Sequence, residues 1–356
     1  MSTPDQTETR RVDHTELETF VRDVLKQAGV AREHADILAE ALVRADLRGV
    51  DSHGVARLET YVRKFESGGF NPDPEITVRD ANDAVAHVDA DDGPGQSAGL
   101  AAMEAAMERA AACGIGAGFV RNSNHFGTAA FYTQRAADHD FVGLSMTNVG
   151  PDVVPYGGTE AFLGTNPISF SIPTDRSFPV TLDMATSVVA MGKIDHVAAE
   201  EDSEIPAEWA VDETGAPTTD PHEVAALRPV GGPKGYGLGL VVDVLCGLLA
   251  GGRPSPDVGP LYDQFGDPMR LGHAMVAIDI STMRDPDEFR AAMGEYVDRI
   301  KSVPTRDDVD EVLLPGELEA RTRQENERRG VPLSRATVES LERLGETYEL
   351  PVPEST

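Results

Sequence analysis

The chain has 356 residues, 40% of them hydrophobic, which is enough for a sizeable core and for two domains. Its 61 acidic and 31 basic residues give a formal net charge of −30, which repels nucleic acids and anionic membrane surfaces. No apolar run approaches the roughly 18 residues of a membrane span, and the polar N-terminal segment lacks the apolar centre of a signal peptide. We therefore expect a cytoplasmic protein without a membrane partner.

The first part of the chain, to about residue 65, is predicted to be helical. A capping-box pattern at residues 15–18 precedes apolar residues at helical spacing, and Gly29 marks a stop. A second helix over about 32–47 leads into the segment 49–54, and the glycines and prolines of 68–74 indicate a change of domain.

The middle of the chain, about 76–185, alternates short strands with one or two helices, the clearest being an alanine-rich helix that ends at Gly114. A polar connection over 196–232 precedes an apolar helix at 235–252, which we expect to be buried. A strand at 272–280 and three helices at 286–301, 316–329 and 334–346 complete the pattern. This order suggests an α+β core flanked by helices from both chain ends.

The glycine-rich segment and the cysteines could suggest a nucleotide-binding fingerprint and a disulfide framework, and the sequence disfavours both. The glycines at 235, 237 and 239 suggest a dinucleotide fingerprint, but the spacing is GxGxG and no hydrophobic strand precedes it, so a Rossmann domain is disfavoured. These glycines can be explained by close packing of a helix at small residues. The other explanation is that Lys234, at the start of this helix, binds phosphate oxygens. The two cysteines, Cys113 and Cys246, are too few for a disulfide framework, and we expect both to be small buried hydrophobes.

His53 and His125 differ from the other histidines because each lies among small residues, in Ser-His-Gly and Asn-His-Phe-Gly. Such settings leave room for a ligand, although a structural role remains the alternative for each. No acidic or cysteine residues stand at ligand spacing nearby, so we expect no metal site.

Arg57 lies four residues after His53, a spacing that places both side chains on one face of a helix. Arginine can bind a carboxylate through two hydrogen bonds while histidine exchanges the proton of a neighbouring hydroxyl. The alternative is that Arg57 pairs with one of the many surface acids.

Together these segments resemble the type-2 malate/L-lactate dehydrogenase family, whose relatives include sulfolactate, ureidoglycolate and diketogulonate oxidoreductases. The resemblance runs in order over about residues 15–345, and its matching stretches are DSHGVARLETY (51–61), RNSNHFGTAAFY (121–132), TNVGPDVVPYGGTEAFLGTNPISFSIP (147–173), LDMATSVVAMGK (182–193), PTTDP (217–221), GGPKGYGLGLVVDVLCGLLAG (231–251) and LPGE (314–317).

The resemblance implies a mainly antiparallel sheet that binds NAD(P) in place of a Rossmann domain, and a homodimer with its active site near the subunit contact. It also implies a helical domain built from both termini, which we place at residues 1–70 and 302–356, with the NAD(P)-binding and substrate domain at 71–301.

Residue by residue, the resemblance makes His53 and His125 the acid/base candidates, because family members use one or the other, and Arg57 the carboxylate partner. The cofactor-binding positions that it implies are Asp183, Met184, Ala185, Lys234, Gly316 and Glu317. Val149 is a departure, since some relatives have a cofactor-binding serine there.

The expected activity is hydride transfer between NAD(P) and a small 2-hydroxy or 2-oxo acid. Malate and L-lactate are the most favoured substrates. Sulfolactate, ureidoglycolate or a cyclic imino acid could replace them, and a non-catalytic homologue that has kept the fold is the alternative of a different class. NAD is the expected cofactor, and NADP remains possible.

The charge composition predicts a dependence of stability on salt. The acids are spread along the whole chain and only five of the 31 bases are lysines, as in proteins adapted to a salt-rich cytoplasm. At 1 M salt the Debye length falls to about 3 Å, which screens the self-repulsion. We expect the melting temperature to rise from dilute buffer to molar potassium chloride, as measured by differential scanning calorimetry. A melting temperature that does not change with salt would contradict this.

Overall fold

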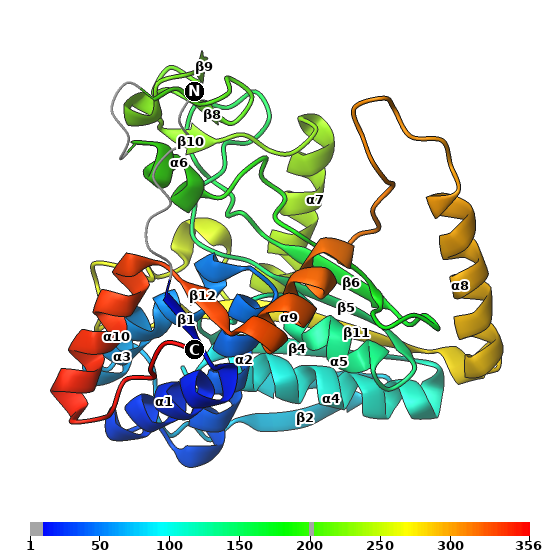
Figure 1. Cartoon of the computed structure of the whole chain (residues 1–356), viewed down its shortest axis with the longest axis horizontal. Helices are drawn as coiled ribbons and strands as arrows, with labels where there is room; N and C mark the ends of the chain where they lie inside the picture. The colour runs from blue at the N-terminus through cyan, green and yellow to red at the C-terminus, as the bar shows by residue number, and fades with distance from the viewer. Residues whose placement is uncertain (1–9, 199–202) are drawn as a thin grey trace.

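The computed structural model describes residues 10–198 and 203–356 (Figure 1). Within these ranges no helix is long and apolar enough to cross a membrane. The helices are α1 His14–Gln27, α2 Arg32–Leu47, α3 Leu58–Glu66, α4 Gly95–Cys113, α5 Ala130–Ala137, α6 Met191–Ala198, α7 Pro233–Asp243, α8 Pro286–Lys301, α9 Glu317–Arg329 and α10 Arg335–Tyr348. The strands are β1 Arg10–Val12, β2 Thr77–Asn82, β3 Val85–Asp89, β4 Ile115–Ser123, β5 Phe141–Thr147, β6 Ile168–Ile172, β7 Val180–Met184, β8 Ala210–Val211, β9 Pro217–Thr218, β10 Ala226–Leu227, β11 Leu271–Asp279 and β12 Val331–Leu333.

A seven-stranded sheet in the order β2-β3-β4-β11-β5-β6-β7 forms the centre of the molecule. Strands β3 and β4 are parallel, joined through α4, and the other neighbouring pairs are antiparallel. Helices α4 and α5 cover one face of this sheet (Figure 1). The α+β fold with a mainly antiparallel sheet is therefore confirmed.

Helices from both chain ends pack together beside the sheet. Buried apolar residues of α1, α2, α3 and α10 share one hydrophobic cluster with the short strand pair β1–β12, which joins residues near the two termini. Figure 1 shows α1, α3 and α10 gathered at one end of the molecule, while α8 stands at the other end and reaches α9 through a long loop. Whether residues 1–70 and 302–356 form a separate domain stays a prediction, and residues 1–9 lie outside the described residues.

Three local predictions differ from the structure. Helix α1 begins at His14, because the carboxylate of Asp13 caps it by accepting from the backbone N–H groups of Thr15 and Glu16, so the capping box at Thr15 is wrong. The described parts of the predicted polar connection, 196–198 and 203–232, contain the end of α6 and the three-stranded sheet β10-β8-β9, and residues 199–202 of it lie outside the described residues. Cys246 is buried as predicted, but Cys113 ends α4 at the surface and is exposed.

The predicted burial of the 235–252 helix is also wrong for the single chain. Helix α7 continues into a π-helical turn at Val244–Leu249. Apolar side chains along it stay exposed, including Val241 at 53%, Leu248 at 63% and Leu249 at 62%. The segment is an apolar helix as predicted, but among the described residues of one chain nothing covers the face that carries Val241, Leu248 and Leu249.

Two glycines let α4 lie directly on β4. A Cβ atom at Gly116 would come within 2.1 Å of the carbonyl oxygen of Ala106, and one at Gly118 within 2.4 Å of that of Ala102. Any larger side chain would push the helix off the sheet, which carries the His125 loop at the end of β4.

We therefore expect Gly118→Val to lower the free energy of unfolding by at least about 1–3 kcal/mol, the usual effect of overpacking. Urea unfolding in molar potassium chloride measures this change. Ala117→Val is the matched control, because Ala117 lies on the opposite face of the same strand and is only half-buried. Equal stabilities of the two variants would contradict the close-packing explanation.

Candidate active site

The Ser-His-Gly segment forms two short 3-10 turns, Asp51–His53 and Val55–Arg57, that meet at Gly54. The buried carboxyl group of Asp46 fixes this junction, since its Oδ2 accepts from the N–H of Val55 at 2.7 Å. A Cβ atom at Gly54 would lie 1.8 Å from Oδ1 of Asp46, so only glycine fits there. His53 and Arg57 are thus not on one continuous helix, as their spacing suggested, but the turns still place both on the same side.

His53 and His125 meet at this point, although 72 positions separate them in the sequence. Their rings are stacked, with centroids 5.5 Å apart and planes inclined by 26°. Both side chains are half-buried, so they keep access to solvent. The hydroxyl of Tyr61, on α3, lies 2.6 Å from Nδ1 of His125 and accepts from Nε2 of Gln96 at 3.1 Å.

The hydrogen bonds of His125 determine which ring nitrogen carries the proton. The backbone N–H of Gly127 points at Nδ1 with a distance of 3.4 Å, and an N–H can only donate. Nδ1 therefore accepts, from Gly127 and from the hydroxyl of Tyr61, and the proton of the neutral ring lies on Nε2. Burial raises the pKa of Tyr61 to about 12, so the hydroxyl keeps its proton.

Both imidazoles are neutral near pH 7. Burial, helped by the positive charge of Arg57, lowers the pKa of His53 to about 4. Burial also holds the pKa of His125 well below its usual value, with smaller contributions from His53, Arg57 and His273. Protonation of His125 at Nδ1 would also place two N–H groups face to face.

Arg57 points into the same region. Its Nε donates to the carbonyl oxygen of Ser52 at 2.6 Å, and its guanidinium lies 5.5 Å from the ring centroid of Tyr262. Within the described residues its two terminal nitrogens have no hydrogen-bond partner. The loop that carries Tyr262 is held by Lys64, which is fully buried and donates from Nζ to the carbonyl oxygens of Pro260, Gln264 and Asp267 at 2.7–3.0 Å.

Strand β7 brings the predicted cofactor positions close to the histidines. The N–H of Ala130, which begins α5 after the His125 loop, donates to Oδ2 of Asp183 at 2.8 Å. Asp183 is open to solvent although protein surrounds it on most sides, and this burial raises its pKa to about 6. Met184 and Ala185 follow and are half-buried. This edge of the sheet is therefore accessible to a ligand.

Gly316 and Lys234 lie at the two ends of this strand. A Cβ atom at Gly316 would be 2.9 Å from Cβ of Thr181, at the start of β7. Just beyond the end of β7, the N–H of Val230 donates to the carbonyl oxygen of Thr186, which leads the chain into α7 and the exposed Lys234. Helix α7 has no side-chain cap at its N-terminus. No contact joins Lys234 to either histidine among the described residues.

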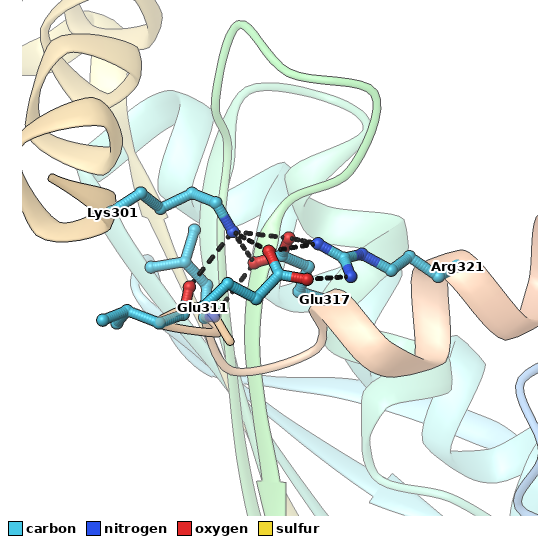
Figure 2. Close-up of polar contacts among 6 residues, drawn as sticks. Lys301, Glu311, Glu317 and Arg321 are labelled. Atoms are coloured by element: carbon cyan, nitrogen blue, oxygen red, sulfur yellow. Dashed lines mark hydrogen bonds and ion pairs between the residues drawn. The ribbon is translucent and has the colours of Figure 1, made fainter. Parts of the chain in front are cut away.

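The side chain of Glu317 is occupied by protein contacts. Figure 2 shows its carboxylate among Lys301, Glu311 and Arg321. It accepts from Nζ of Lys301 at 2.7 and 2.8 Å and from the N–H of Leu314 at 3.0 Å, and it pairs with Arg321. This buried carboxylate therefore fastens the loop before α9 to α8, and the backbone N–H of Glu317 donates to the carbonyl oxygen of Leu314 at 3.1 Å.

The backbone of Val149 is also engaged. Its N–H donates to Oδ1 of Asn166 at 3.1 Å, and its side chain packs beside Gly164. In residues 10–198 and 203–356 no group of three histidine, cysteine or acidic side chains comes together to hold a metal ion.

The sequence analysis missed Tyr61, Asp46 and Gln96. Tyr61 follows Arg57 by four residues, and this helical spacing next to a candidate arginine could have indicated it. Asp46 and Gln96 act through contacts across the fold, and no local pattern identifies such residues.

Comparisons with known proteins identify the family of the chain. The family model described as malate/L-lactate dehydrogenase matches residues 12–342. The chain is 39% identical to a malate dehydrogenase of Pyrococcus abyssi over 94% of each chain, and 34% identical to an Escherichia coli ureidoglycolate dehydrogenase (NAD(+)) over 95% of this chain and 94% of the relative. The solved sulfolactate dehydrogenase of Methanocaldococcus jannaschii has a TM-score of 0.90, 34% identity and coverage of 96% of this chain and 98% of its own. The chain therefore belongs to the malate/L-lactate dehydrogenase family.

Proposed function

We propose that this dehydrogenase transfers a hydride between NAD and a small 2-hydroxy acid, with malate or L-lactate as the first substrates to test. The observation that carries the proposal is the neutral pair His53–His125 beside Arg57, whose terminal nitrogens are free. Arg57 can hold the substrate carboxylate through two hydrogen bonds while the histidines face the neighbouring hydroxyl.

The two histidines take different roles in this proposal. Nε2 of neutral His125 carries a proton and donates to the substrate oxygen, held in place by Tyr61 and Gly127. In this proposal Nδ1 of neutral His53 carries the ring proton and donates to the hydroxyl oxygen of Ser52, at 2.9 Å, so that Nε2 is free to accept the hydroxyl proton of the substrate. In the reduction of a 2-oxo acid, the same nitrogen returns the proton.

A nicotinamide cofactor fits the edge formed by β7 and the start of α7. The uncapped N-terminus of α7 and the exposed Lys234 suit phosphate oxygens. We propose further contacts through Asp183, Met184, Ala185 and the backbone of Gly316 and Glu317. When bound, the cofactor supplies the acceptor or donor of the hydride. NAD is the first choice because one relative is named an NAD(+) enzyme, and NADP is the alternative.

The substrate can differ from malate and lactate beyond its 2-hydroxy acid group. The relatives named sulfolactate and ureidoglycolate dehydrogenase are each 34% identical to this chain, and the matches cover 96% and 95% of it. Arg57 and the histidines contact the part that such acids have in common, so they do not select between them. Tyr262, which is 45% exposed on the loop held by Lys64, is the candidate to contact the distal group.

We also propose a homodimer in the cytoplasm. The exposed apolar side chains of α7 and its π-helical turn, among them Val241, Leu248 and Leu249, form a surface suited to a second copy. The exposed thiol of Cys113 is suited to a reducing compartment.

Substitution of the histidines tests the proposal. A panel of 2-oxo acids with NADH and NADPH, followed at 340 nm in molar potassium chloride, identifies the best substrate. On it, His53→Ala should lower kcat about 10²–10⁴-fold, the usual contribution of a general base, and His125→Ala should also lower it strongly. His139→Ala, an exposed surface histidine, is the control. Full turnover in both variants would refute the assignment, and absence of nucleotide binding by the unaltered protein would favour a non-catalytic homologue.

The pH profile of hydroxy acid oxidation reports the protonation of His53. A base must be neutral, and His53 stays neutral above its pKa of about 4. At saturating cofactor, protonation of His53 should therefore cause no fall in kcat/KM between pH 7 and 5.5. If His53 had the pKa of an ordinary imidazole, kcat/KM would fall below about pH 6.5. An inflection near pH 6 belongs to Asp183 and should vanish in Asp183→Asn. A fall near 6.5 that persists in this variant would contradict the neutral pair.

A further inference from the structure

A cavity of about 280 Å³ opens between α2, α5 and α9, next to the proposed cofactor edge. Its charged lining consists of Arg44 and Arg48 from α2, Arg323 and Glu327 from α9, and Asp138, which follows α5. Three guanidinium groups thus face two carboxylates, in a chain whose formal net charge is −30. The lining is cationic where the protein as a whole is acidic.

Arg48 is the unusual member of this group. Its side chain is only 5% exposed, yet it makes no hydrogen bond or ion pair with any described residue. Asp183 and Glu319 are near enough to favour its positive charge, but neither forms an ion pair with it. Its nitrogens border the cavity and so are not sealed from water, but a guanidinium that is nearly buried and has no protein acceptor for its five N–H groups is costly in free energy.

The positive charges of the other two arginines, Arg44 and Arg323, are only partly balanced by protein partners. Arg44 donates to Oε1 of Gln134 at 3.2 Å and lies 3.9 Å from Glu40, but its Nε is buried without a partner. Arg323 pairs with Glu327 at 2.7 Å. The positive charge of Arg323 also disfavours the charged forms of both Arg44 and Arg48. An anion in the cavity would relieve this repulsion and provide the missing acceptors.

The position of the cavity indicates which anion. Gly316 lines it and also lies against Thr181 on β7, two residues before Asp183. Arg48 is near enough to Asp183 for the carboxylate to favour its positive charge. The cavity therefore continues the edge along which the cofactor is proposed to bind, and guanidinium groups match the oxygens of a phosphate.

We propose that Arg44, Arg48 and Arg323 form a phosphate-binding site for the nicotinamide cofactor. This inference rests on the proposed function. The phosphate is either the 2′-phosphate of NADP or the diphosphate that NAD and NADP share. A binding experiment with both nucleotides distinguishes these two possibilities. Phe178 and Pro179, which also line the cavity, provide an apolar surface beside the phosphate.

The test is a binding titration that needs no substrate. NADH and NADPH are titrated separately into unaltered protein, Arg48→Gln and Arg323→Gln, at one fixed ionic strength, with the nicotinamide fluorescence as the signal. Arg323→Gln is included because Arg323 is half-buried and its replacement should leave folding intact. Arg329→Gln is the matched control, since Arg329 is exposed on the same helix and pairs with Glu325 away from the cavity.

A loss of about 10- to 100-fold in NADPH affinity with NADH unchanged would support the proposal and identify the 2′-phosphate, because charged hydrogen bonds contribute on this scale. An equal loss for both nucleotides would support it and identify the diphosphate. Arg48→Gln should also keep or raise the melting temperature of the free protein, because it removes an unpaired buried charge, whereas an arginine needed for folding would lower it.

Unchanged affinities for both nucleotides in both variants would overturn the proposal. Calorimetric titration with inorganic phosphate then identifies the alternative, a phosphate site unconnected with the cofactor, if phosphate binds to unaltered protein without weakening NADH or NADPH. Unaltered protein that binds neither nucleotide would contradict the proposed function itself, so the two failures are distinguishable.

Discussion

The contact of Asp46 with the backbone at Gly54 and Val55 is the constraint on which the site depends. It joins α2, in the helical part of the molecule, to the turns that carry His53 and Arg57. Burial raises the pKa of Asp46 well above its usual value, so a carboxyl group is retained there at a cost. The N–H of Ala130 on Asp183 makes the corresponding link from the His125 loop to β7. Two hydrogen bonds thus hold the helices, the loop and the sheet in place around His53 and His125.

Much of the fold could be predicted because the chain's periodicity is clear. Most predicted helices occur within a residue or two of their expected bounds, including α2 at Arg32–Leu47 and α8 at Pro286–Lys301. His53 and His125 were recognisable because small residues surround them. The segment after β7 shows the limit, since its apolar helix was expected to be buried, and nothing in a single sequence says that α7 keeps an apolar face free in one chain.

The part of the site that could not be predicted consists of partners across the fold. The tautomer of His125 depends on Tyr61 and Gly127, and the isolation of Arg48 depends on which carboxylates happen not to reach it. Glu317 is a residue that the sequence did identify, but with a different role from the one that its side chain has in the structure. The resemblance implied a cofactor contact there, and the structure has its carboxylate bound to Lys301 and Arg321, so its side chain positions the loop that carries Gly316 (Figure 2).

Lys64 has a consequence for how substrate preference can change. Its three hydrogen bonds to the 260–267 loop all go to carbonyl oxygens of the main chain, which every amino acid possesses, and the ring centroid of Phe265 lies 5.9 Å from its Nζ. The position of the loop is therefore independent of most of its side chains, including Tyr262 opposite Arg57. Substitutions in this loop can therefore reshape the surface around Tyr262 while Arg57 and the histidines stay where they are. If the proposed function holds, a single buried lysine thus lets substrate selectivity change without a change in the chemistry.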